Sequence, residues 1–106
     1  MSDVKITVDA GACRFKTIIQ PVISDDMMTI ELTIISDCPN VRKLAPNIGN
    51  VDAMDAVASR IMDNSLMKRC NEFIPHPACP VPCALVKACE VAMDTAVKKN
   101  VTMTFE

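Results

Sequence analysis

The chain of 106 residues is predicted to fold as an α+β domain, with a four-stranded, mainly antiparallel sheet and two to four helices packed on one of its faces. Short runs near both ends alternate apolar and polar residues, which is typical of half-buried strands. Between these runs, apolar residues recur at helical spacing. Half of the residues are hydrophobic and 23% are charged, a balance that favours a globular chain with its own core. Because no repeat or linker interrupts the pattern, residues 1–106 are expected to form a single domain.

Four segments carry the strand pattern. In residues 4–9, three valine or isoleucine residues alternate with polar ones. Residues 17–23 and 28–35 are both β-rich, and the Ser-Asp-Asp sequence between them predicts a hairpin turn. Pro21 indicates that the first arm of this hairpin is an edge strand or contains a bulge. Valine, methionine and phenylalanine alternate with threonine in residues 101–105, which predicts the last strand of the sheet at the C-terminal end.

Three segments carry the helical pattern. Apolar residues at helical spacing predict a helix over residues 51–62, with Asn50 as its N-cap. A second helix is predicted over residues 66–73, and a long one over residues 80–98.

Composition excludes several classes of function. The net charge of −2 is spread along the chain without a basic stripe, and only three aromatic residues could stack on bases, so the chain is not expected to bind nucleic acid. The nearly uncharged stretches are too short or too polar to cross a bilayer, which argues against a membrane protein. The N-terminal residues lack a basic stretch followed by an apolar run, so a cytoplasmic location is expected.

Six cysteines are the main chemical feature of the sequence. In a reducing cytoplasm thiols are kept reduced, so metal binding, redox chemistry or core packing explains them better than disulfides do. Two of them stand in Asp37-Cys38-Pro39 and Ala78-Cys79-Pro80, where proline suits the first position of a helix. Each cysteine is then expected near the N-cap, where the helix dipole stabilises a thiolate and lowers the thiol pKa. Cysteine as a tolerated small residue at a helix start is the alternative for each.

The side of the helix on which a cysteine lies separates the cysteines expected at the surface from those expected in the core. On the long helix a narrow polar stripe is formed by Lys87, Glu90, Asp94 and Lys98. Cys83 and Cys79 precede Lys87 by four and eight residues and are expected on the side of this stripe, whereas Cys89 points to the apolar side. Cys70 falls on the apolar stripe of the preceding helix. Cys70 and Cys89 are therefore predicted to be buried core residues.

The candidate site consists of Cys13, Cys38, Cys79 and Cys83, with His76 as a further candidate ligand. Cys13 follows Gly11, one of two glycines, which is expected to serve a special backbone conformation or a close approach. Four thiolates suit an iron–sulfur cluster or zinc. The spacing is neither the paired C-x₂-C of a zinc ribbon nor the closely spaced run of a ferredoxin. His76 lies between two prolines in an expected loop, where an ordinary surface histidine is the commoner explanation.

Three runs resemble those of a known family. Residues 6–15 (ITVDAGACRF), 36–41 (SDCPNV) and 76–84 (HPACPVPCA) are similar to segments of a family of small, uncharacterised, cysteine-containing proteins of anaerobic prokaryotes. The resemblance covers most of the chain in the same order and implies no activity. An anaerobic setting favours an oxygen-sensitive cluster over zinc.

Three interpretations follow from these residues. The first is a metal- or cluster-binding protein that works with a redox or carrier protein partner. The second is a thiol–disulfide redox or thiol-transfer protein, with Cys79 as nucleophile and Cys83 as its resolving partner. The third is an interaction domain in which the cysteines only pack. Whether the chain is an enzyme stays open.

Overall fold

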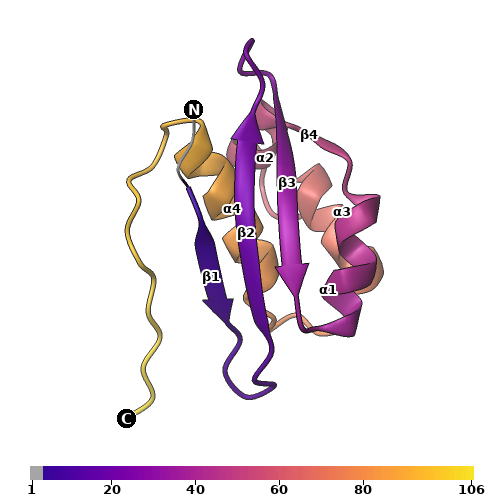
Figure 1. Cartoon of the computed structure of the whole chain (residues 1–106), viewed down its shortest axis with the longest axis vertical. Helices are drawn as coiled ribbons and strands as arrows, with labels where there is room; N and C mark the ends of the chain where they lie inside the picture. Colours follow the sequence, from indigo (N-terminus) through magenta and orange to yellow (C-terminus); the bar gives the residue numbers. More distant parts are fainter. Residues whose placement is uncertain (1–3) are drawn as a thin grey trace.

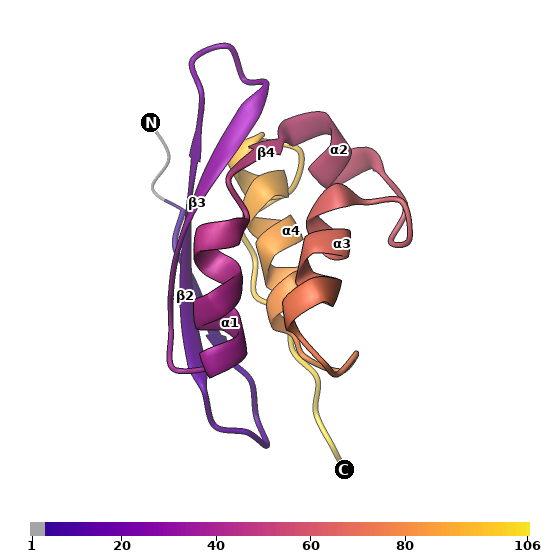
Figure 2. The ribbon, with the colours of Figure 1, turned by 90° about the vertical axis from the view of Figure 1, so that its right-hand side faces the viewer.

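A computed structural model describes residues 4–106, and it confirms the α+β fold with a four-stranded antiparallel sheet. All helices lie on one face of the sheet, as the two perpendicular views show (Figures 1 and 2). The strands are β1 (Ile6–Asp9), β2 (Lys16–Ile23), β3 (Thr29–Ser36) and β4 (Asn50–Asp52), in the spatial order β1-β2-β3-β4. The helices are α1 (Pro39–Leu44), a 3₁₀ turn (Ala45–Asn47), α2 (Ala53–Ala58), α3 (Ser65–Phe73) and α4 (Val81–Ala92).

The first three strands form the predicted meander. β2 and β3 pair without interruption from Thr17 opposite Ser36 to Ile23 opposite Ile30. The turn between them is closed by Ser24 and Asp26, because the Asp26 carboxylate accepts hydrogen bonds from the Ser24 hydroxyl and from the backbone N–H of Met28, at 3.0 Å for the latter. These contacts confirm the predicted hairpin.

Pro21 neither places β2 at an edge nor creates a bulge, because β2 lies between β1 and β3 with a continuous register. The hairpin bond from the Ala10 N–H to the Phe15 carbonyl, together with the alternation of antiparallel pairs, directs the backbone groups of odd-numbered β2 residues toward β1. The last β1 partner is Ile6, which pairs with Ile19. The N–H that Pro21 lacks would therefore point past the end of the β1 pairing, where the ladder needs no donor.

The fourth strand differs from the one predicted. β4 pairs with β3 through Val51 opposite Ile30, whereas residues 95–106 form an extended tail with no regular secondary structure. The alternation at residues 101–105 indicates only that this segment could form a strand, not that it pairs with another one. Pairing requires a neighbouring strand, and the segment after β3 fills the place beside β3 instead.

The helices begin and end partly where predicted. The segment 51–62 is divided, since Val51 is buried in the sheet and α2 begins only after Asp52, whose carboxylate accepts the Asp55 N–H at 3.2 Å in place of an Asn50 cap. Ile61 lies in the following loop and is 74% exposed. α3 confirms the helix predicted over residues 66–73.

The last helix stops earlier than predicted. α4 ends at Ala92 and not at residue 98, because Asp94 adopts the left-handed conformation with φ of 61° and the Thr95 N–H returns to the Glu90 carbonyl at 2.9 Å. The predicted polar stripe is therefore shorter, and only its first two members, Lys87 and Glu90, belong to the helix.

The core lies between the covered face of the sheet and the helices. Its fully buried large side chains include Ile19 and Ile30 from the sheet and Leu44 and Leu85 from α1 and α4. Of the helices within residues 4–106, none combines the length and apolar character needed to cross a membrane.

Candidate functional site

The loops at one end of the molecule bring together segments that are far apart in the sequence. The β1–β2 loop, the junction of β3 with α1, and the loop from α3 to α4 all lie at the lower end in Figure 1. These three segments contain Cys13, Cys38 and Cys79, while Cys83 lies in the first turn of α4. We refer to this region as the cysteine end.

Cys13 lies in the tight loop that joins β1 to β2. Gly11 has φ of 80°, and a Cβ at this position would meet nothing within 4 Å, so glycine serves the backbone conformation and not a close approach. Arg14 also adopts a left-handed conformation, and its N–H donates to the Gly11 carbonyl at 2.9 Å. The loop holds the Cys13 side chain exposed at its tip.

Cys38 is the N-cap residue of α1, with Pro39 at the first helical position, as the Cys-Pro sequence predicts. Its N–H donates to the Ser36 hydroxyl at 3.0 Å, and that hydroxyl is paired in turn with the buried Thr17 hydroxyl at 2.7 Å. The Arg42 Nε donates to the Ser36 carbonyl at 2.8 Å. These bonds tie the start of α1 to the ends of β2 and β3, so Cys38 has a rigid backbone support at the edge of the core.

A further pair of bonds fixes this corner to the Cys13 loop. The Asp37 N–H donates to the Lys16 carbonyl at 3.0 Å, and the Lys16 N–H donates to the Asp37 carboxylate at 3.3 Å. Because Lys16 begins β2 directly after the loop, the position of Cys38 relative to Cys13 is set by the sheet.

Cys79 lies one residue earlier relative to its helix than predicted. Pro80 is the N-cap of α4 and Val81 its first residue, so Cys79 immediately precedes the cap. The Val81 N–H, one of the orphan donors of the first turn, bonds to the Cys79 sulfur and favours its thiolate. The half-buried Cys79 side chain packs, like that of Cys38, against the margin of the core.

The pKa of Cys79 is raised and not lowered, which corrects the prediction from the helix dipole. Burial is the largest cause, and it outweighs the bond from the Val81 N–H. The charges that Cys38 and Cys13 can carry raise the pKa of Cys79 further. Cys38 and Cys13, which come from two other segments of the chain, are therefore close enough to Cys79 to affect its ionisation.

Cys70 is a further neighbour that the helical phase did not reveal. It is 2% exposed, and burial raises its pKa to about 12, with a smaller contribution from the charge of Cys79. Its burial confirms the predicted core position, as does that of Cys89, which is fully buried and whose pKa burial also raises to about 12. The phase of α3 places Cys70 on the apolar side, but its nearness to Cys79 depends on how α3 packs against the loop that follows it.

The two remaining candidates lie at the surface. Cys83 is exposed, as its position on the polar side of α4 predicts, and it is not among the thiols whose charge acts on Cys79. His76 is exposed in the loop from α3 to α4, between Pro75 and Pro77.

The side chains at the cysteine end do not form a ready-made metal site. Within residues 4–106, no group of three or more histidine, cysteine, aspartate or glutamate side chains is arranged so that it could hold a metal ion. Cys13 and Cys79 both lie in loops, however, and a thiol in a loop can move by side-chain rotation and loop adjustment more readily than one inside a helix.

Comparison with known proteins identifies a family and no activity. The model of a family of unknown function, DUF6951, matches residues 4–105. No curated protein and no solved structure shows a significant match to the chain.

Proposed function

The chain belongs to the DUF6951 family of unknown function, and from the placement of its thiols we propose that it is a small metal-binding protein whose cysteine end holds an iron–sulfur cluster or a zinc ion. The observation that carries this proposal is that Cys38 and Cys13, from two other segments, both contribute to the raised pKa of Cys79. These residues are separated by 25 and 41 positions in the sequence, and the fold brings them to one end.

The electrostatics of Cys79 favour a cation at this place. A half-buried thiol with two further thiols nearby resists ionisation, because its thiolate would lose solvent and gain negative neighbours. A bound metal cation reverses both effects, and soft thiolate ligands select zinc and iron–sulfur clusters. The Val81 N–H then acts as a hydrogen bond to a ligand sulfur, the kind of contact that tunes such centres.

Cys13, Cys38 and Cys79 are the proposed ligands. Cys83 and His76 are the candidates for a fourth, since both lie near Cys79 in the chain. A centre with only three protein thiolates keeps one coordination position for a ligand from outside, as catalytic metal sites do. The setting we propose is the reducing cytoplasm of an anaerobe, where the chain passes electrons or metal to a redox or carrier protein.

The test is the metal content of protein purified without oxygen, before and after reconstitution with zinc or with iron and sulfide. The chain has no tryptophan and no tyrosine, so charge-transfer absorption of a cluster would stand on a nearly blank background. We expect one centre per chain. Replacement of Cys13, Cys38 or Cys79 by serine should each reduce the bound metal by at least about tenfold, because even the loss of a hydrogen-bond partner of a ligand weakens metal binding by about 10–100-fold.

Matched controls lie on the same chain. Cys83→Ser and His76→Ala decide whether a fourth ligand exists, and Cys89→Ala removes a buried thiol far from the loops without affecting metal content. If the wild-type protein binds neither metal after anaerobic reconstitution, the proposal is wrong.

Thiol exchange is the competing function. It requires Cys79 to attack as a thiolate with Cys83 as its partner, and the raised pKa of Cys79 works against this at neutral pH. Trapping of a mixed disulfide in Cys83→Ser, together with wild-type metal content in Cys13→Ser and Cys38→Ser, would favour exchange over metal binding. Unchanged metal content and thiol reactivity in every single mutant would leave the cysteines as packing residues of an interaction domain.

A further inference from the structure

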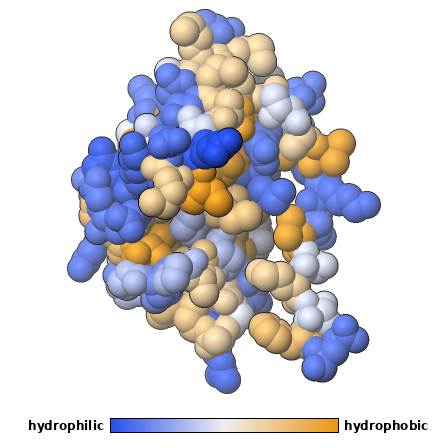
Figure 3. All heavy atoms as spheres, turned by 180° about the vertical axis from the view of Figure 1, so that it is seen from behind, coloured by the Kyte–Doolittle hydropathy of each residue, from blue (hydrophilic) through white to orange (hydrophobic). Residues whose placement is uncertain are grey.

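The C-terminal tail, residues 95–106, takes no part in the cysteine end. It runs as an extended segment that lies to the left of β1 in Figure 1 and on the helix side of the sheet in Figure 2. Val101, Met103 and Phe105 are 60, 83 and 100% exposed, and alternate residues of an extended chain lie on one face. The tail therefore presents an apolar stripe to solvent, and seen from behind it projects from the body with apolar and polar residues in turn along it (Figure 3).

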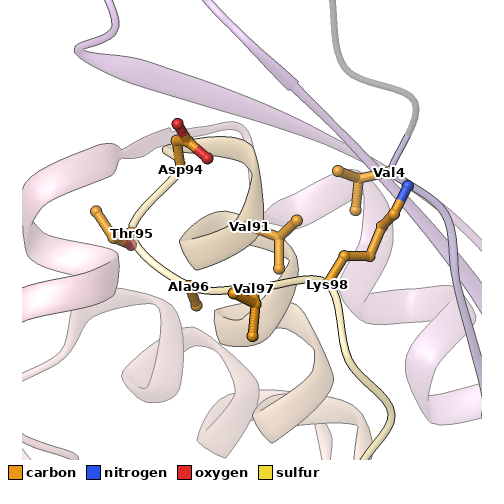
Figure 4. Close-up of a pocket in the computed structure, with 7 residues that line it drawn as sticks. All are labelled: Val4, Val91, Asp94, Thr95, Ala96, Val97 and Lys98. Carbon is orange, nitrogen blue, oxygen red and sulfur yellow. The ribbon is translucent and has the colours of Figure 1, made fainter.

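The root of the tail is a turn at the end of α4. The turn at Asp94 is held by bonds from the Asp94 N–H to the Val91 carbonyl at 3.0 Å and from the Thr95 N–H to Glu90 at 2.9 Å. Beyond it lies a hollow of about 420 Å³ between the end of α4, Val4 before β1, and the first residues of the tail (Figure 4). Val4, Val91 and Val97 are among its lining residues, so a hollow lies where the start of the tail meets the body.

The outer side of β1 is an open edge of the sheet. In the strand order β1-β2-β3-β4, no strand formed by residues 4–106 follows β1 on that side. The Ala10 N–H bonds to the Phe15 carbonyl, so Val8, two residues earlier, also forms a hydrogen-bonded pair with Thr17. Hydrogen-bonded positions alternate along a strand, so the backbone N–H and C=O of Thr7 point away from β2 toward the open edge. The other edge strand, β4, has three residues and continues directly into α2, so β1 is the edge better suited to accept a strand.

We propose that the tail adds as a further strand to β1 of a second copy of this chain, and that the two tails are exchanged in a symmetric dimer. Each copy supplies one exposed strand-forming tail and one open edge, so a two-fold arrangement satisfies both pairs of elements and closes the assembly. In such a pairing the stripe of Val101, Met103 and Phe105 continues the apolar face formed by Ile6 and Val8.

The exchanged tails supply part of the surface that a stable dimer needs. An aromatic side chain buries about 150–250 Å², so the two Phe105 side chains alone contribute about 300–500 Å². Strand pairing and the other apolar side chains add to this, in an interface that needs on the order of 1,200 Å². The dimer also removes a long exposed apolar strand, which is an aggregation hazard in a monomer.

Molar mass in solution, measured by light scattering with refractive-index detection, tests this proposal without relying on aromatic absorbance. We expect the wild-type chain to have about twice the monomer mass of 11.5 kDa. The double variant Met103→Glu/Phe105→Glu should be a monomer, whereas Thr102→Glu/Thr104→Glu, which adds the same charge to the other face of the tail, should remain a dimer. A chain ending at Lys98 should be a monomer with a folded core, as judged by its circular dichroism.

Mixing two defective copies separates exchange from other modes of association. Thr7→Pro impairs the edge but retains the tail, and the chain ending at Lys98 retains the edge but lacks the tail. Each should be monomeric alone, and the mixture should form a heterodimer through one tail and one edge. A monomeric wild type, a dimer that persists in Met103→Glu/Phe105→Glu, or equal dissociation by both pairs of charges would overturn the proposal.

Discussion

Cysteine residues in this chain differ by the solvent and charge around each sulfur. Cys70 and Cys89 are 2% and 0% exposed and have pKa values raised to about 12. At neutral pH they are neutral, packed side chains, which is the usual state of a buried cysteine. Cys79 is only half-buried, and other thiols contribute to its raised pKa, so its charge state depends on what binds nearby.

The buried thiols make the stability of the protein fall in alkali. Above the ordinary thiol pKa of 9.0, the unfolded chain has lost protons that folded Cys70 and Cys89 retain up to about pH 12. The free energy of unfolding should therefore decrease as pH rises through this window, with a limiting slope of about 1.4 kcal/mol per pH unit for each thiol. Urea unfolding followed by circular dichroism across this range measures the slope.

Cys89→Ala provides the comparison. It should be less stable than the wild type at neutral pH, because it leaves a small cavity, but its stability should fall less steeply in alkali. Cys83→Ala makes the same chemical change at an exposed position and should retain the wild-type slope. Equal slopes in the wild type and Cys89→Ala would contradict a buried neutral thiol at this position.

Helix caps connect the short elements of this fold. Asn64 is the N-cap of α3, where its Oδ1 accepts the Met67 N–H at 3.1 Å. Its Nδ2 donates to the Ala56 and Asp55 carbonyls at 2.9 and 3.2 Å. The Asn64 side chain, which is 2% exposed, thus provides hydrogen-bond partners for backbone groups at the start of α3 and at the end of α2.

Asn64→Ala should therefore cost more than the loss of an ordinary cap. We expect a decrease of about 2–3 kcal/mol in the free energy of unfolding, because the buried Ala56 carbonyl loses the Asn64 donor in addition to the lost cap. Asp52→Ala removes the exposed cap of α2 and should cost about 1 kcal/mol. Chemical denaturation of the two variants checks this order, and Asn64→Asp, which keeps the acceptor without the donors, should lie between Asn64→Ala and the wild type.

The fold as a whole turns three distant loops into one candidate centre, and this couples metal binding to pH. Each thiol must lose its proton to become a ligand, and the raised pKa of Cys79 means that this proton is still bound at neutral pH. Zinc affinity should therefore increase as the solution changes from mildly acidic to mildly alkaline, by up to about tenfold per pH unit for each thiol that deprotonates.

Competition with a chelator at several pH values measures this dependence. Cys79→Ser should bind zinc more weakly and with a smaller pH dependence, since one titrating ligand is absent. Cys89→Ala should retain the pH dependence of the wild type. An affinity that does not vary with pH in the wild type would argue against thiol ligands.

Sequence alone determined the features that depend on neighbouring residues. The alternation in residues 4–9 and the β-rich runs at residues 17–23 and 28–35 predicted three strands correctly, because strand-forming residues and burial of every second side chain are local features of a strand. Helical phase placed Cys70 and Cys89 in the core, and proline after Cys38 marked the start of α1. These features follow from local backbone geometry, so the residues of a short segment are sufficient to predict them.

Only the tertiary structure decided which distant segments meet. The short strand at Val51, not the alternating stretch at residues 101–105, pairs with β3, because a strand becomes part of a sheet only where a neighbour offers its edge. Likewise, burial against the core, and not the helix dipole alone, sets the direction of the Cys79 pKa shift. The convergence of Cys13, Cys38 and Cys79 belongs to this second class: it follows from the direction in which each strand and helix runs, and no spacing within the sequence records that direction.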